Sequence, residues 1–66
     1  MKLKLDEKAD ALYLRLDDSK NIESEEVSPG VILDFNERSQ VVGVEILRLS
    51  KRLPKLNLRE FQYQTA

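Results

Sequence analysis

The fold is decided by residues 30–47, which read GVILDFNERSQVVGVEIL. Two apolar runs, residues 31–35 and 41–47, flank a polar segment at residues 36–39. Short runs rich in Val, Ile and Phe are typical of strands, and a loop of this length is a common connection between antiparallel strands. These residues therefore predict a β-hairpin.

The register of this hairpin follows from its apolar side chains. Val31 and Leu33 share one face with Val42 and Val44 if Leu33 lies opposite Val42 and Val31 lies opposite Val44. A slip of one residue would turn the apolar set of one strand outward, so burial of this first face specifies the register.

Three more strands are predicted upstream of the hairpin. Residues 2–5 alternate Lys and Leu, and residues 11–16 place a leucine at every second position. Residues 22–28 are rich in glutamate, which suits a solvated face or a sheet edge. Residues 17–21 and Pro29-Gly30 carry turn formers between the runs. We expect a small four- to five-stranded antiparallel β-meander.

The second face of this sheet is mixed in character. An antiparallel sheet with one solvated face normally shows a sharper alternation of apolar and polar residues. We therefore expect the C-terminal segment or a second copy of the chain to cover part of it. The residues on this face are Ala11, Tyr13, Ile32, Val41 and Gly43 together with Arg15, Asp34 and Glu45.

A short amphipathic helix is predicted over Ile46–Leu53, where apolar residues recur at helical spacing until Pro54. Beyond it, Asn57 and Glu60 have the spacing of a capping box, with a possible edge strand at residues 61–65. One continuous strand over residues 55–65 is the competing interpretation. The fold class is α+β, in one domain over residues 1–66.

Size and composition bear on how such a domain is held together. The chain has 66 residues, no cysteine and no histidine, which excludes disulfides and zinc sites built on thiolate or imidazole. Domains this small usually need added support, and self-association is the support that remains. We expect a homodimer. The alternating Lys and Leu at the start do not resemble a signal peptide, and no apolar run has membrane-spanning length, so we expect a cytoplasmic protein.

Charge divides the chain into two parts. Residues 1–47 form an acidic sheet body, with six Lys or Arg against eleven Asp or Glu, hence a net −5. Residues 48–66, the helix and basic tail, have five Lys or Arg against one Glu, hence +4. Such asymmetry can mark a binding tail. We expect the tail to dock on its own acidic body or on that of a second copy.

Catalysis is not expected. A serine nucleophile without histidine would need a lysine or carboxylate base in a dry pocket, and a sheet of this size has little room for one. Asp34, Asn36 and Glu45 match places in a calcium-binding EF-hand loop, but Arg38 and Ser39 stand where a ligand and a glycine are needed. We treat this match as chance and predict no enzyme activity, no metal and no cofactor.

The sequence leaves two candidate binding sites. An interface for another protein or a second copy combines second-face residues with the acidic strand, namely Tyr13, Ile32, Val41, Glu23, Glu25 and Glu26. The alternative is a dimeric nucleic-acid-binding protein, whose tail would contact phosphates through Arg48, Lys51, Arg52, Lys55 and Arg59. The acidic body argues against the alternative.

Four segments in order also resemble a known family: residues 6–16, 22–27, 30–35 and 41–47. They are similar to small bacterial and archaeal proteins catalogued as domain of unknown function 2283. The resemblance covers about the first 50 residues and implies a compact single-domain protein without an established activity. No catalytic residue is carried over. The residues that match are Asp10, Ala11, Leu12, Tyr13, Gly30, Asp34, Gly43 and Glu45.

From these observations we expect a non-enzymatic protein–protein interaction module. An antitoxin-like role, in which the acidic body masks a basic partner protein, is one concrete form of this hypothesis.

Overall fold

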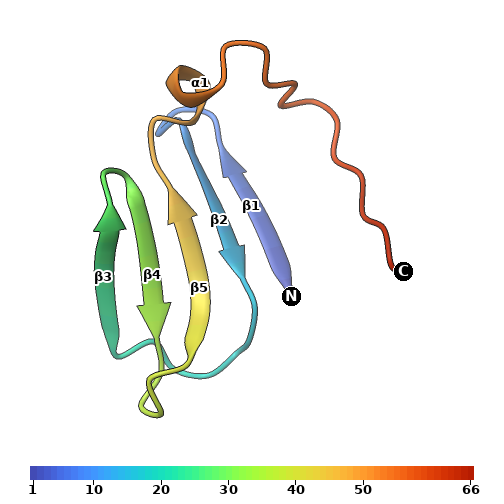
Figure 1. Ribbon diagram of the computed structural model, residues 1–66. Helices are drawn as coiled ribbons and strands as arrows, with labels where there is room; N and C mark the ends of the chain where they lie inside the picture. The colour runs from blue at the N-terminus through green and yellow to red at the C-terminus, as the bar shows by residue number, and fades with distance from the viewer.

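A computed structural model describes residues 1–66 as one antiparallel five-stranded sheet, a short helix and a C-terminal segment (Figure 1). The elements are β1 (Lys2–Asp6), β2 (Ala11–Arg15), β3 (Glu23–Ser28), β4 (Val31–Phe35), β5 (Val41–Ile46) and α1 (Leu49–Arg52). All five predicted strands are present. The chain is mostly β, because its helix has only four residues.

The strand order is β1-β2-β5-β4-β3, so the prediction of a meander is only partly right. β3, β4 and β5 follow one another as a meander, but β2 pairs with β5 and not with β3. Residues 16–22 carry the chain from β2 to the far edge of the sheet (Figure 1). The acidic strand β3 lies at that edge, where its glutamates stay in water, while the apolar strand β5 takes a central place.

The predicted register of the β4–β5 hairpin is wrong by two residues. Val31 pairs with Ile46 and Leu33 pairs with Val44. The loop contributes one residue of this difference, because Asn36 N donates to Gln40 O and only three residues lie between them. A bulge contributes the other, since Asp34 pairs with Gly43 but Phe35 with Val41. Both shifts together keep the same side chains on the same face.

The loop is stabilised by the side chain of Asn36, which is buried. Its Oδ1 accepts hydrogen bonds from the backbone N–H groups of Arg38 (2.9 Å) and Gln40 (3.0 Å). Ser39 completes the turn with a left-handed backbone, φ 59°. A three-residue loop that ends in this conformation is a common hairpin connection, and it is an alternative to the predicted four-residue loop.

The paired registers define two faces. Directly opposed residues share a face, so one face, here called the leucine face, comprises Leu3, Leu5, Leu12, Leu14, Val31, Leu33, Val44 and Ile46. The other, here called the tyrosine face, comprises Lys2, Lys4, Tyr13, Arg15, Ser24, Glu26, Ile32, Asp34, Gly43 and Glu45. Val42 and Leu49 are the only buried hydrophobic residues of the chain.

The helix is shorter than predicted, and the cause is tertiary. Ile46 belongs to β5, where it pairs with Leu12, and Arg48 has a left-handed backbone with φ 53°. The helix therefore begins at Leu49. Asp10, from the β1–β2 turn, caps it: Oδ1 accepts from Ser50 N (3.0 Å) and Oδ2 accepts from Ser50 Oγ (2.8 Å).

Residues 55–66, here called the arm, form neither of the structures considered from the sequence. They contain a turn in which Arg59 N donates to Asn57 Oδ1 at 3.0 Å, and no helix or strand follows it. The arm lies on the leucine-face side of the sheet, since it lines hollows with Leu3, Leu12 and Leu14. The C-terminal segment, one of the two covers predicted for the tyrosine face, thus lies on the opposite side of the sheet.

Candidate interaction surface

The tyrosine face is organised around the buried carboxylate of Asp34, which is 7% exposed. Tyr13 Oη donates to its Oδ2 at 2.8 Å, and Ser24 Oγ donates to its Oδ1 at 2.6 Å. These three residues come from β2, β4 and β3, so the bonds span the sheet from one side of β5 to the far edge. Both carboxylate oxygens are satisfied, and the arrangement specifies which strands are neighbours.

Gly43 on β5 makes room for this network. A Cβ at this position would lie 2.6 Å from Tyr13 Oη and 3.0 Å from Asp34 Oδ2. The absence of a side chain lets the tyrosine cross over β5 to reach β4. The sequence analysis placed Gly43 on the second face beside Tyr13 and Asp34 but did not indicate that the tyrosine crosses over it.

Arg15 extends the network toward the β2–β3 connection. Its guanidinium donates to Tyr13 Oη at 3.4 Å and to the backbone oxygen of Ser19. Ser19 in turn donates from its hydroxyl and its N–H to Asp17 Oδ2. These hydrogen bonds, that of the hydroxyl first, lower the pKa of the Asp17 carboxyl below its ordinary value of 3.8.

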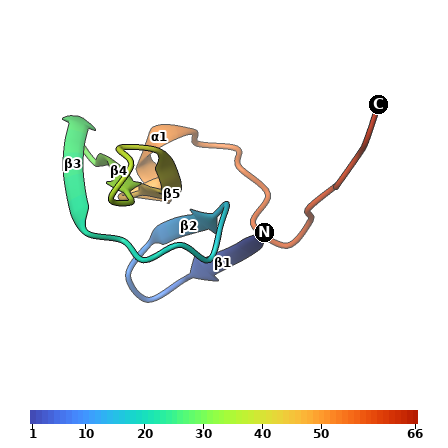
Figure 2. The ribbon, with the colours of Figure 1, turned by 90° about the horizontal axis from the view of Figure 1, so that it is seen from below.

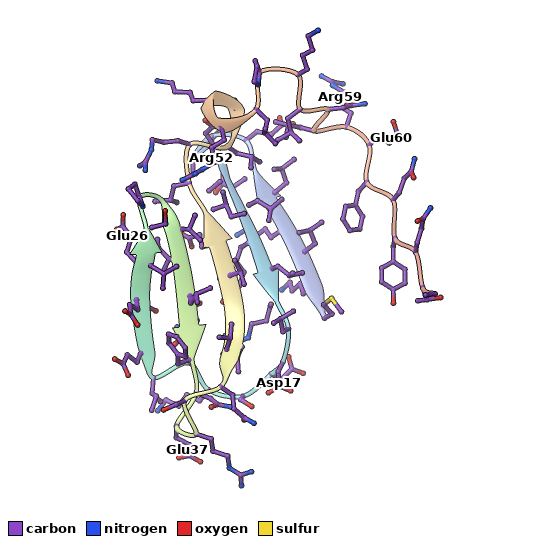
Figure 3. The ribbon with its side chains drawn as sticks, viewed as in Figure 1. Asp17, Glu26, Glu37, Arg52, Arg59 and Glu60 are labelled. Carbon is purple, nitrogen blue, oxygen red and sulfur yellow. The ribbon has the colours of Figure 1, made fainter.

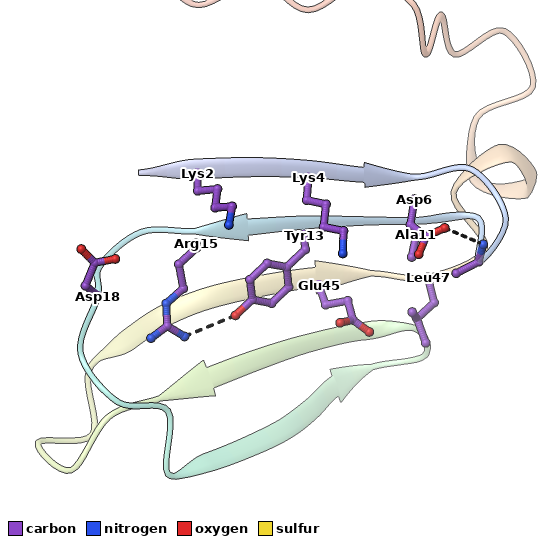
Figure 4. A pocket seen from close by; sticks show the side chains of 10 residues that line it. Lys2, Lys4, Asp6, Ala11, Tyr13, Arg15, Asp18, Glu45 and Leu47 are labelled. Atoms are coloured by element: carbon purple, nitrogen blue, oxygen red, sulfur yellow. Dashed lines mark hydrogen bonds between the residues drawn. The ribbon is translucent and has the colours of Figure 1, made fainter.

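An open groove of about 620 Å³ lies on the tyrosine face beside this network (Figure 4). Its charged lining is balanced, with three cations against three acids: Lys2, Lys4 and Arg15 against Asp6, Asp18 and Glu45. A balanced lining does not favour a ligand of either sign. No three acidic side chains gather closely enough to hold a metal ion.

The structure does not bring the predicted apolar interface residues together. Tyr13 and Ile32 are half-buried on the tyrosine face, but Glu45 pairs with both and lies between them. Val41 is 38% exposed and lies at the opposite end of β5 from Ile46. These three residues do not form a continuous patch.

The three predicted acidic residues share β3 but divide between the faces. Glu23 and Glu25 pair with Phe35 and Leu33, which places Glu25 at the rim of the leucine face. Glu26 pairs with Ile32 on the tyrosine face, and its Oε1 accepts from Gly30 N at 3.1 Å. All three are exposed.

The predicted basic cluster divides as well. Arg52 donates from Nε to Leu47 O at 2.8 Å and from Nη2 to Pro29 O, beside Glu26 (Figure 3). The Arg48 guanidinium lies against Gly30 in the same turn. Lys51 is exposed on α1, while Lys55 and Arg59 lie on the arm. Part of the basic tail is therefore docked on the chain's own body, as one of the two predicted arrangements has it.

The surface that sequence reasoning missed is the leucine face. Each of its eight residues is only half-buried. Val42, next to Gly43 at the far end of β5 on the same side, is the exception, with 1% of its surface exposed. The arm approaches Leu3, Leu5, Leu12 and Leu14 but leaves hollows of about 250 and 300 Å³ beside them. The signal available in the sequence was that a single short helix, predicted over Ile46–Leu53, was the only helical layer for a sheet of up to five strands.

Neither the length nor the apolar character needed to span a bilayer is reached by any helix of the structure. No significant match to the chain was found among curated proteins or among solved structures. A family model described as protein of unknown function (DUF2283) matches residues 2–50, which include the whole sheet, the Tyr13–Asp34 network and Ser50 with its partner Asp10. The match confirms the resemblance seen in the sequence, and the chain belongs to the DUF2283 family.

Proposed function

We propose that this protein is a non-enzymatic protein–protein interaction module that acts as a homodimer, joined through the leucine face. The observation that supports this proposal most strongly is the half-buried state of that face. A sheet with one apolar side needs a second layer to exclude water. The chain supplies α1 at one end of the sheet and an arm that hollows separate from the leucines beneath it (Figure 1).

Surface area supports the same proposal. A folded monomer of 7.7 kDa is expected to expose about 4300 Å², whereas this chain exposes 5606 Å². The excess of about 1300 Å² exceeds the roughly 800 Å² that each partner buries in a standard interface. The radius of gyration is also large, 12.8 Å against about 11 Å expected for 66 residues.

A narrower form of this function is antitoxin-like masking of a basic partner protein. It would use the acidic edge strand β3, whose glutamates are all exposed. The nucleic-acid alternative gains no comparable support, because Arg48 and Arg52 face the chain's own β3–β4 turn.

Light scattering coupled to size exclusion tests the homodimer. We expect twice the 7.7 kDa chain mass over a range from micromolar to millimolar concentration. A constant single-chain mass throughout that range would overturn the proposal. Fluorescence from an apolar dye provides the complementary readout, since a dimer hides the leucine face and a monomer exposes it.

A further inference from the structure

The arm is not fastened to the body of its own chain. The one backbone–backbone hydrogen bond of residues 53–66 runs from Leu56 N to Leu53 O. The side-chain hydrogen bonds of this segment also join residues within it, and none reaches the sheet. Phe61 and Tyr63 are 69% and 71% exposed, although aromatic side chains gain most from burial. The end of the arm turns away from the sheet (Figure 2).

Hollows separate the arm from the sheet beneath it. One, of about 250 Å³, lies between Leu56 and Phe61 of the arm and leucines of β1 and β2. A second, of about 300 Å³, lies between Tyr63 and Met1. Both are lined mainly by hydrophobic residues. Both hollows are open to solvent, so their apolar walls are in contact with water, and a second apolar surface between arm and sheet would bury them.

The charges at the two edges of the sheet indicate how a second copy would be oriented over the leucine face. The two edges of the sheet differ: β3 carries Glu23 and Glu25, while the arm beside β1 carries Lys55 and Arg59 (Figure 1). A two-fold axis parallel to the strands places the β1 edge of one copy over the β3 edge of the other. An axis across the strands would instead bring the two β3 edges together and oppose their glutamates. Complementary charge favours the first arrangement.

We propose that the arm of each copy is a strap that lies along the acidic β3 edge of a second copy of this chain. This inference rests on the proposed homodimer. The strap places Arg59 beside the exposed glutamates of the partner's β3, and it lets Phe61 and Tyr63 cover the outer part of the partner's leucine face. Because the interface is two-fold, each contact is made twice.

Chemical cross-linking between single-cysteine variants tests the strap, and the chain has no cysteine of its own to interfere. Tyr63→Cys and Glu25→Cys proteins are mixed, left to exchange subunits and treated with a short bis-maleimide. We expect a covalent pair containing one chain of each variant, identified by mass. The matched control mixes Tyr63→Cys with Lys4→Cys, which is exposed on the opposite face of the sheet.

The outcomes separate the strap from the dimer itself. A mixed Tyr63–Glu25 product at least about tenfold above the Lys4 control supports the strap. A product no greater than the control, while light scattering still shows a dimer, overturns the strap and leaves the homodimer standing. A single-chain mass for both variants and for the unmodified protein overturns both proposals.

Charge reversal gives an independent readout on the same contact. Glu25→Arg and Arg59→Glu should each raise the dimer dissociation constant about tenfold, because each opposes like charges at two symmetric positions. The double variant restores opposite charges and should return to within about threefold of the unmodified protein. A double variant as weak as the product of the two single effects contradicts the pairing.

Discussion

On the tyrosine face, Asp34 accepts hydrogen bonds from two hydroxyl groups and is 7% exposed. On the leucine face, eight apolar side chains are all only half-buried. Hydrogen bonds are short and directional, so three side chains are enough to satisfy one carboxylate. Apolar burial depends on area, and a four-residue helix with an arm that hollows separate from the sheet does not cover five strands. One face is therefore complete within the chain and the other requires a second surface.

The largest effect on stability and on oligomeric state is expected from a charge in the middle of the leucine face. Leu14 pairs with Leu3 and Val44, so Leu14→Asp places an unpaired carboxylate among apolar side chains. We expect loss of the dimer and about 3 kcal/mol of stability, measured by light scattering and urea unfolding. Lys4→Asp is the control on the exposed tyrosine side of β1 and should cost under about 0.5 kcal/mol. A dimeric Leu14→Asp protein would contradict the assignment of the interface.

The tyrosine face should respond differently, losing stability while keeping its oligomeric state. Asp34→Ala leaves the hydroxyls of Tyr13 and Ser24 without their charged acceptor, and we expect a loss of about 2 kcal/mol in urea unfolding. Folded Asp34→Ala protein should remain a dimer. A double-mutant cycle with Tyr13→Phe measures the coupling, and strictly additive effects would show that the Tyr13–Asp34 bond contributes nothing.

A smaller effect is expected where the network passes over β5. Gly43→Ala introduces a Cβ 2.6 Å from Tyr13 Oη, and we expect a loss of between about 1 and 2 kcal/mol by the same measurement. In a Tyr13→Phe background the clashing oxygen is gone, so the cost of Gly43→Ala should be smaller. An equal cost in both backgrounds would place the strain elsewhere.

The smallest effect concerns the exposed Asp17–Ser19 turn. Since folding lowers the pKa of Asp17, its contribution to stability is present above pH 3.8 and is lost as the pH falls through the lower folded value. Ser19→Ala removes the hydroxyl bond that contributes most, so the pKa should rise toward 3.8 in an NMR titration of the Asp17 carboxyl. An unchanged titration would assign the shift to the remaining backbone bonds.

Local patterns explain which parts of the fold were predictable. Apolar alternation in β1 and β2, the apolar runs of β4 and β5 and the Pro29-Gly30 turn correctly indicated strands and a bend. The glutamates of β3 suited a solvated face or a sheet edge, and the structure places β3 at an edge. The helix was predicted too long, because Ile46 fits both a strand and a helix pattern and only pairing with Leu12 decides between them. The Tyr13–Asp34 bond joins residues 21 positions apart, and no local pattern reports it.

The sequence by itself determined the strands, their inward leucines and the separation of an acidic body from a basic tail, because these depend on side-chain type and on a period of two residues. Only the tertiary structure decided that β5 lies beside β2, that the hairpin register shifts at a bulge, and that Asp10 caps α1. These features depend on the free energy of contacts between distant segments.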